Sequence, residues 1–145
     1  MGFGVSGSTA IIFLGVLIAT GTLYTATSNA TENVLEARDA NSERALERMN
    51  TDISITNATY DTGTSNLTVN VTNTGAETLS VDETTLLVDN AHVTVPDANS
   101  SVEGDTTTDL WYAGQNLSIV VGVSSEPPRV KVVTGTGVAA TEVVS

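Results

Sequence analysis

STAIIFLGVLIATGTLY, residues 8–24, decides the fold of the chain, because it is a run of apolar and small residues without a charge. The uncharged stretch around it covers residues 2–31. A helix needs about 20 residues to cross ~30 Å of hydrocarbon, and this stretch is longer. The sequence therefore predicts a transmembrane helix within residues 1–29.

The residues before the span favour an anchor that is kept. Only seven residues precede the run and none is Lys or Arg, so we expect neither a signal peptide nor the basic-residue–glycine processing site of archaeal pilin-type precursors. By the positive-inside rule, Arg38, Arg44 and Arg48 favour a cytoplasmic domain after the span. Two features oppose this orientation. Five carboxylates lie among these arginines, and the seven residues before the span are too short a segment to favour translocation of the N-terminus. We therefore predict that the C-terminal domain lies outside the cell.

Small residues recur along one side of the predicted span, at spacings of four, three and four. Such a stripe lets two helices approach closely in lipid, where packing drives association. The alternative is that the span is rich in Gly, Ala and Thr throughout. The predicted helix-packing residues are Gly15, Ala19, Thr22 and Ala26.

Residues 30–50 read ATENVLEARDANSERALERMN, without Gly or Pro and with many good helix formers. The sequence predicts that the helix continues out of the membrane as a stalk. A single helix over residues 8–49 would be roughly 63 Å long at 1.5 Å per residue. The stalk packs on a neighbouring helix or on the domain itself, or it is a solvated rod.

The remaining residues, 51–145, form a strongly acidic domain. They hold twelve carboxylates against Arg129 and Lys131, a balance of −10 within a whole-chain charge of −12. Such a charge repels nucleic acid and destabilises a compact fold at low salt, whereas molar salt screens it. The composition therefore predicts a halophilic protein; the alternative is an ordinary acidic secreted domain. The chain has no cysteine, so no disulfide is available.

Beyond residue 51 the apolar pattern changes from a helical period to a period of two. Leu67, Val69 and Val71 alternate with Thr68, Asn70 and Thr72, and the run that contains Leu79 and Val81 continues the alternation. Turn-rich clusters separate these runs at short intervals. The sequence predicts seven to nine strands, the last over residues 138–144. The expected fold is mainly β: an antiparallel immunoglobulin-like β-sandwich preceded by a single long N-terminal transmembrane α-helix.

Aromatic residues suggest two roles. Trp111 is the largest apolar side chain, so core packing is its default role. The sharper hypothesis is a partner interface made by an exposed Trp111 and Tyr112 pair.

Three patterns that resemble chemical sites are weak. His92 is the only histidine and lies in a strand-like run, so neither a metal site nor a catalytic site is expected there. Gly135, Gly137 and Ala140 fit a dinucleotide fingerprint, but too few residues follow for the required helix and strand. One run of alternating oxygen-bearing side chains resembles a calcium-binding loop: Asp97, Asn99, Ser101 and Glu103. The glycine and the closing glutamate that such a loop requires are absent. No cofactor and no enzymatic activity are predicted.

Six of the eleven asparagines head an N-x-S/T sequon, about twice the number that chance predicts. Glycans need a translocated and solvated acceptor, so the excess favours an extracellular domain. Asn29 lies too near the membrane to count. The predicted N-glycosylation positions are Asn57, Asn66, Asn70, Asn99 and Asn116.

Three segments resemble one known family. They are the opening MGFGVSGSTAIIFLGVLIATGTLYTAT, the acidic helix ENVLEARDANSERALERM and the strand pair LTVNVTNTGAETLSVDETTLLVDN. Together they are similar to the haloarchaeal archaellum stator protein F family (FlaF, also ArlF). The G-type stator proteins share this layout, and the archaellins share part of it.

The resemblance implies a structural, non-catalytic function. The expected domains are an anchor (1–29), a helical stalk (30–50) and an extracellular sandwich (51–145). The chain would be a single-pass protein of the cytoplasmic membrane with its sandwich in the pseudoperiplasm. The expected partners are the S-layer protein, a G-type stator protein, membrane lipid and a second copy paired through strand edges. The candidate partner interface consists of Thr68, Asn70, Thr72, Trp111 and Tyr112. The alternatives are an archaellin or pilin-type filament subunit and a surface binding module unrelated to motility.

Overall fold

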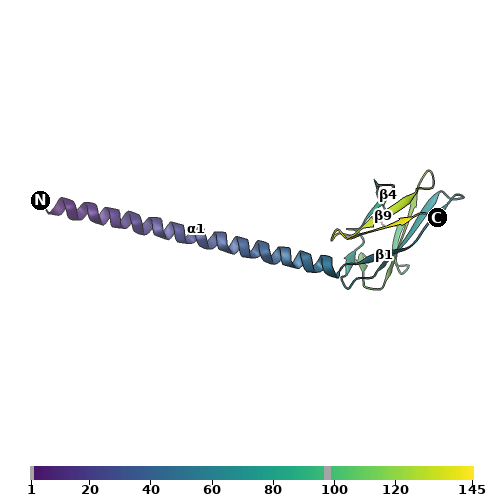
Figure 1. The fold of residues 1–145 in the computed structure, drawn as a ribbon, viewed down its shortest axis with the longest axis horizontal. Coiled ribbons are helices and arrows are strands. Elements are labelled where there is room, and N and C mark those ends of the chain that lie inside the picture. The colour runs from purple at the N-terminus through teal and green to yellow at the C-terminus, as the bar shows by residue number, and fades with distance from the viewer. Residues whose placement is uncertain (1, 97–98) are drawn as a thin grey trace. The chain divides into compact units, whose positions relative to one another are not determined.

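A computed structural model describes residues 2–96 and 99–145. Its first element is one long helix, α1 (Phe3–Asn50), and strands follow it to the C-terminus (Figure 1). The predicted continuous helix is therefore confirmed, and it begins five residues earlier than residue 8. The chain divides into two compact units, Met1–Glu43 and Arg44–Ser145. The last residues of α1 thus belong to the same unit as the strands.

Ten strands occur in the described residues, one more than the upper end of the prediction. Several strands are short: β3 and β7 have two residues each and pair with each other, and the predicted strand through Val81 ends at Ser80. The strands are β1 (Ile53–Asp61), β2 (Asn66–Asn73), β3 (Leu79–Ser80), β4 (Thr85–Val88), β5 (Ala91–Val93), β6 (Ser100–Val102), β7 (Leu110–Trp111), β8 (Asn116–Gly122), β9 (Arg129–Val133) and β10 (Ala139–Val143).

All strand pairs are antiparallel and form two four-stranded sheets with a small ribbon. The first sheet has the order β1-β2-β8-β6 and the second the order β10-β9-β4-β5, while β3 and β7 make the ribbon. One apolar core lies between the sheets, as expected for two sheets that each bury one face. The predicted antiparallel β-sandwich is therefore confirmed.

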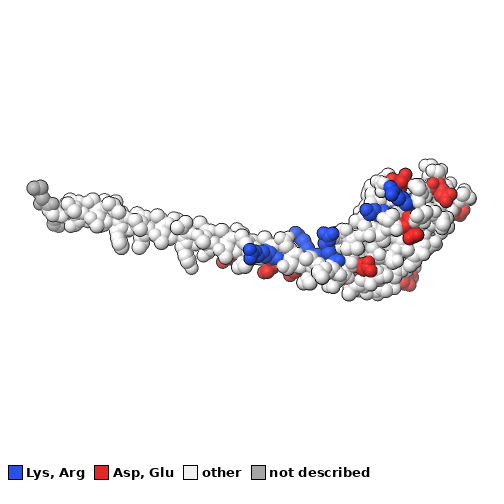
Figure 2. Space-filling view, in the orientation of Figure 1, with Lys and Arg blue, Asp and Glu red and all other residues white. Residues whose placement is uncertain are grey.

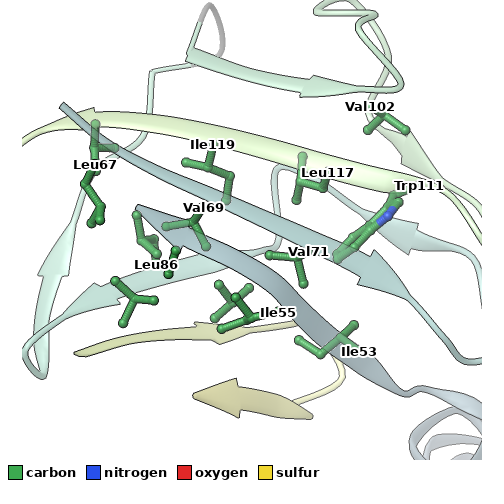
Figure 3. Packing of buried hydrophobic residues seen from close by; sticks show 14 of the residues in the cluster. Ile53, Ile55, Leu67, Val69, Val71, Leu86, Val102, Trp111, Leu117 and Ile119 are labelled. Atoms are coloured by element: carbon green, nitrogen blue, oxygen red, sulfur yellow. The ribbon is translucent and has the colours of Figure 1, made fainter. Parts of the chain in front are cut away.

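The core follows from the period of two in the strands. In β2, Leu67, Val69 and Val71 are completely buried while the alternating polar residues are half-buried on the outer face. β8 contributes Leu117 and Ile119 in the same way (Figure 3). Burying a side chain of this size stabilises the fold by about 1.5–3 kcal/mol.

The C-terminus closes one edge of the sandwich. The amide of Ser145 donates to the carbonyl of Ala58 at 3.0 Å, and the amide of Tyr60 donates to the carbonyl of Ser145 at 3.3 Å. These bonds join the end of the chain to β1, so the backbone groups of that edge strand are partly satisfied.

Candidate functional site

The apolar part of α1 has no protein cover. Ile11, Phe13 and Leu17 are each more than 60% exposed. Among the described residues, α1 is the one helix that is long and apolar enough to cross a membrane. A row of large apolar side chains this long needs lipid or other helices around it.

Most serine and threonine hydroxyls on this helix are bonded within the helix. Thr20 donates to the carbonyl of Val16 at 2.7 Å, and Thr27 donates to the carbonyl of Leu23 at 2.9 Å. The same bond, to a carbonyl three or four residues earlier, is made by Ser6, Ser8, Thr9, Thr22, Thr25 and Thr31. A buried hydroxyl without a partner is costly in an apolar medium, so these bonds suit the helix to lipid.

The stripe of small residues lies exposed along α1. A β-carbon added at Gly15 would meet nothing within 4 Å. The hydroxyl of Thr22 donates to the carbonyl of Ala19 at 3.0 Å. Nothing in the single chain covers Gly15, Ala19, Thr22 or Ala26, so a helix-packing role for them stays a prediction.

A loop after β2 holds the end of α1. The carbonyl of Asn50 accepts the amides of Ala76 at 2.8 Å and Glu77 at 3.2 Å. The carbonyl of Asp52 accepts the amide of Gly75 at 2.9 Å. The last carbonyls of a helix have no partner inside it, and this loop supplies partners. Residues 74–77 therefore fasten the helix end to the sandwich, and we call them the helix clamp.

Asn73 supports the clamp from inside the domain. Its side chain is fully buried; its Nδ2 donates to the carbonyls of Glu77 at 2.8 Å and Trp111 at 3.1 Å, and its Oδ1 accepts the amide of Gly75 at 3.1 Å. Asn73 was not among the residues that the sequence singled out as functional. A turn-forming residue at the end of a strand was the available signal, but the bond to Trp111 joins residues 38 positions apart, which the sequence does not bring together.

The outer face of the first sheet is polar and almost free of charge. Thr68, Asn70 and Thr72 lie half-buried on its central strand, β2. Thr68 pairs with Thr59 and Val120, Asn70 pairs with Asn57 and Ser118, and Thr72 pairs with Ser54 and Asn116. The structure thus brings these three predicted interface residues together on one face.

Strand geometry explains much of the sequon excess. Because side chains alternate on a strand, an N-x-T sequon places Asn and Thr on the outer face and the middle residue in the core. Leu67, Val71 and Leu117 are buried middle residues of this kind. The excess therefore follows from polar strand faces rich in Asn and Thr, and it is not independent support for glycosylation.

The predicted acceptors differ in accessibility. Asn57 is exposed on edge strand β1, beside an irregularity in its pairing with β2. Asn66, Asn70 and Asn116 are half-buried, Asn99 is exposed, and Asn29 lies in α1.

Trp111 is not part of an exposed interface. Its side chain is 0% exposed and its Nε1 donates to the carbonyl of Gln115 at 2.8 Å. The hypothesis of an exposed aromatic pair is wrong for Trp111, because the core takes the large ring and the loop satisfies its N–H; core packing is confirmed. Tyr112 is 49% exposed and remains available to a partner.

A comparison with family models matches residues 2–144 to the archaeal-type flagellin family. The match covers the helix and the whole sandwich. This chain belongs to the archaeal-type flagellin family. The predicted kinship with archaellum proteins is therefore confirmed, and this flagellin-family member is a structural component related to the archaellum.

Two solved structures are similar to this flagellin-family chain. The archaellum periplasmic stator protein FlaG from Sulfolobus acidocaldarius is 18% identical, with a TM-score of 0.46 over 63% of this chain and 97% of that chain. The archaellum periplasmic stator protein complex of FlaF and FlaG from Sulfolobus acidocaldarius is 18% identical, with a TM-score of 0.43 over 62% of this chain and 85% of that chain. No curated protein matches the sequence.

The weak chemical patterns have structural roles in this flagellin-family member. His92 lies exposed on edge strand β5. Gly137 has a φ of 84° in the turn between β9 and β10, so the glycine-rich pattern belongs to a hairpin and not to a strand–helix unit. In the calcium-like alternation, one carboxylate oxygen of Glu103 accepts the amide of Asn116 at 2.7 Å, and Asp97 lies outside the described residues.

Proposed function

We propose that the chain is a membrane-anchored stator component of the archaellum, which ties the motor to the S-layer in the pseudoperiplasm. The observation that carries this proposal is α1, whose apolar side chains are uncovered and most of whose hydroxyls are bonded within the helix. Those properties fit a helix that stays in lipid. Membership of the archaeal-type flagellin family supports the link to the archaellum.

A stator must resist force between its anchor and its attachment. The helix clamp suits this task, because several backbone hydrogen bonds and the buried Asn73 join the end of α1 to the sandwich. The proposed partners are the S-layer protein and a G-type stator protein, as the sequence resemblance implies. The sandwich in this proposal lies outside the cytoplasmic membrane and catalyses no reaction.

A second candidate is a filament subunit. The matching family model describes flagellins, and neighbouring copies of α1 could cover the apolar side chains in place of lipid. The two candidates thus differ in what surrounds α1. The third hypothesis is a surface binding module without a role in motility.

Fractionation of native cells and deletion of the gene test the proposal. We expect the chain in the membrane fraction with an unprocessed N-terminus by mass spectrometry, and we expect deletion cells to build filaments but fail to swim. Recovery of a processed chain from sheared filaments would support the filament subunit. Deletion cells that swim normally would leave only the surface module.

A further inference from the structure

The outer face of the second sheet carries both basic residues of the β domain. Arg129 and Lys131 are two residues apart on β9 and alternate with the fully buried Val130 and Val132, so both point away from the core. The blue side chains of the sandwich lie beside each other in Figure 2. A domain with twelve carboxylates therefore has its only two permanent cations on one strand face.

Lys131 lies in a row that crosses all four strands of this sheet. The strand pairs join His92 to Leu87, Leu87 to Lys131 and Lys131 to Thr141. Apolar residues lie in and beside this row on the same face. Leu87, in the row, and Val133, beside it, are half-buried. Val143, opposite Arg129, is 69% exposed. We call these residues the β9 face: Leu87, His92, Arg129, Lys131, Val133, Thr141 and Val143.

The positive charge of Lys131 is not used inside the domain. Within residues 2–96 and 99–145 its ammonium group makes neither an ion pair nor a hydrogen bond. Arg129 makes one weak ion pair, 3.8 Å to Asp89, and both of these side chains are more than half exposed. A surface pair of this kind contributes at most about 1 kcal/mol. Lys131 is therefore free to bind a carboxylate of another molecule.

The charge around the β9 face limits the kind of partner. An extended polyanion such as nucleic acid would meet the −10 of the whole domain, so repulsion outweighs two cations. A protein surface with a few local carboxylates can reach Lys131 and cover Leu87 and Val143 as well. A symmetric contact between two copies would place Lys131 and Arg129 near their own counterparts, which is unfavourable.

We propose that the β9 face docks an acidic surface patch of another protein of the cell envelope, with Lys131 at the centre of the contact. The proposal rests on the stator function and names the chemistry of its partner. Burial of Leu87, Val133 and Val143 supplies a contribution that salt does not screen, and Lys131 sets which patch is accepted.

The chain offers a direct test, because Lys131 is its only lysine. A water-soluble carbodiimide activates a carboxyl group, and the Nζ of a touching lysine displaces the urea to form an amide bond. Native membranes of the source cells are treated with this reagent and the crosslinked peptides are sequenced by mass spectrometry. We expect Lys131 joined to an Asp or Glu of another envelope protein.

Three variants separate charge from reactivity. Lys131→Arg should abolish the crosslink but keep co-purification of the crosslinked protein, because the charge stays. Lys131→Glu should weaken co-purification about tenfold. Replacing the identified partner carboxylate by Lys should restore it. Thr106→Glu, at an exposed bend outside both the β9 face and the predicted polar interface, is the control and should leave co-purification unchanged.

The following outcomes overturn the proposal: no crosslink at Lys131, a crosslink to a second copy of the chain, a crosslink to a nucleotide, or undiminished co-purification of Lys131→Glu. Failure of the stator function is distinguishable, because it is read from fractionation and swimming of cells with the native residue at position 131. If the stator function holds and the crosslink is absent, only the β9 face is refuted.

Discussion

The carbonyl oxygen of Asn50, the last residue of α1, lies so close to Gly75 that a β-carbon at position 75 would collide with it. The same carbonyl accepts the amides of the two residues after Gly75. A glycine is therefore required where the helix clamp meets the helix end. This contact joins the end of α1 to the sandwich.

Gly75→Ala should destabilise the unit that contains the sandwich. The neighbouring atoms of residues 50–52 are backbone and cannot move aside as a flexible side chain can. We expect the free energy of unfolding to fall by about 1–3 kcal/mol, as for other overpacked sites. Denaturant titration of the full chain in detergent, followed by the fluorescence of the buried Trp111, measures this. Trp111 is the only tryptophan, so the signal reports the sandwich.

Gly122→Ala is the control for this experiment. A β-carbon at position 122 would be 4.0 Å from the nearest atom, Oδ1 of Asn66, and the substitution should change stability by less than about 0.5 kcal/mol. Equal effects of the two substitutions would contradict the clamp.

Asn73→Ala should also weaken the clamp. It removes the side-chain donor of the carbonyls of Glu77 and Trp111, while the amide of Gly75 keeps the carbonyl of Asp52, and an unsatisfied buried group costs about 1–3 kcal/mol. We expect a loss of about 3 kcal/mol in the same titration. Asn70→Ala changes the outer face of the same strand, so it should stay near the native stability. A tolerated Asn73→Ala would show that water replaces these bonds.

The sequence predicted the features that depend on one period along the chain. The helix through residue 49 and the strand through Leu67, Val69 and Val71 follow from local apolar spacing, which needs no knowledge of distant residues. The place of Trp111 in the core followed from its size. Local patterns thus determined the fold class and the long apolar helix.

Features that depend on contacts between distant segments were missed. The bond from Asn73 to the carbonyl of Trp111 in β7 joins residues 38 positions apart, and the β9 face depends on the pairing of β9 with β4 and β10. The strand count was too low because a three-residue strand such as β6 is too short to carry a periodic signal. The grouping of Thr68, Asn70 and Thr72 on one face could be predicted, because all three alternate along a single strand.

Glycan occupancy should follow strand position if the domain is glycosylated. Asn57 is exposed on an edge strand, whereas Asn70 is half-buried between β1 and β8. We therefore expect higher occupancy at Asn57 than at Asn70 in peptides of the native protein analysed by mass spectrometry. Thr59→Ala and Thr72→Ala each remove one sequon and serve as matched controls. Preferential occupancy of Asn70 would indicate modification before the sheet forms.

Acid should destabilise the turn after β1. The amide of Gly63 and the hydroxyl of Thr64 each donate to the carboxylate of Asp61 at 2.8 Å, and these bonds lower the pKa of Asp61 below its usual 3.8. A lowered pKa in the folded state gives stability that is present above the unfolded pKa and lost as the pH falls through the folded pKa. We expect stability to decline below about pH 4. Asp61→Asn should flatten this decline, and parallel curves for the two proteins would contradict it.

Low salt should unfold the sandwich. Its twelve carboxylates face two cations, and in the described residues a single weak ion pair offsets the repulsion. The Debye length grows from about 3 Å at 1 M salt to about 30 Å at 0.01 M. The repulsion between carboxylates is therefore screened in molar salt but acts between them in dilute buffer. Dilution of the full chain in detergent should therefore shift the emission of Trp111 towards that of an exposed indole. Glu126→Gln with Glu142→Gln removes two exposed charges and should move the transition to lower salt. If native emission persists in dilute buffer, the core outweighs the repulsion and the protein does not depend on salt.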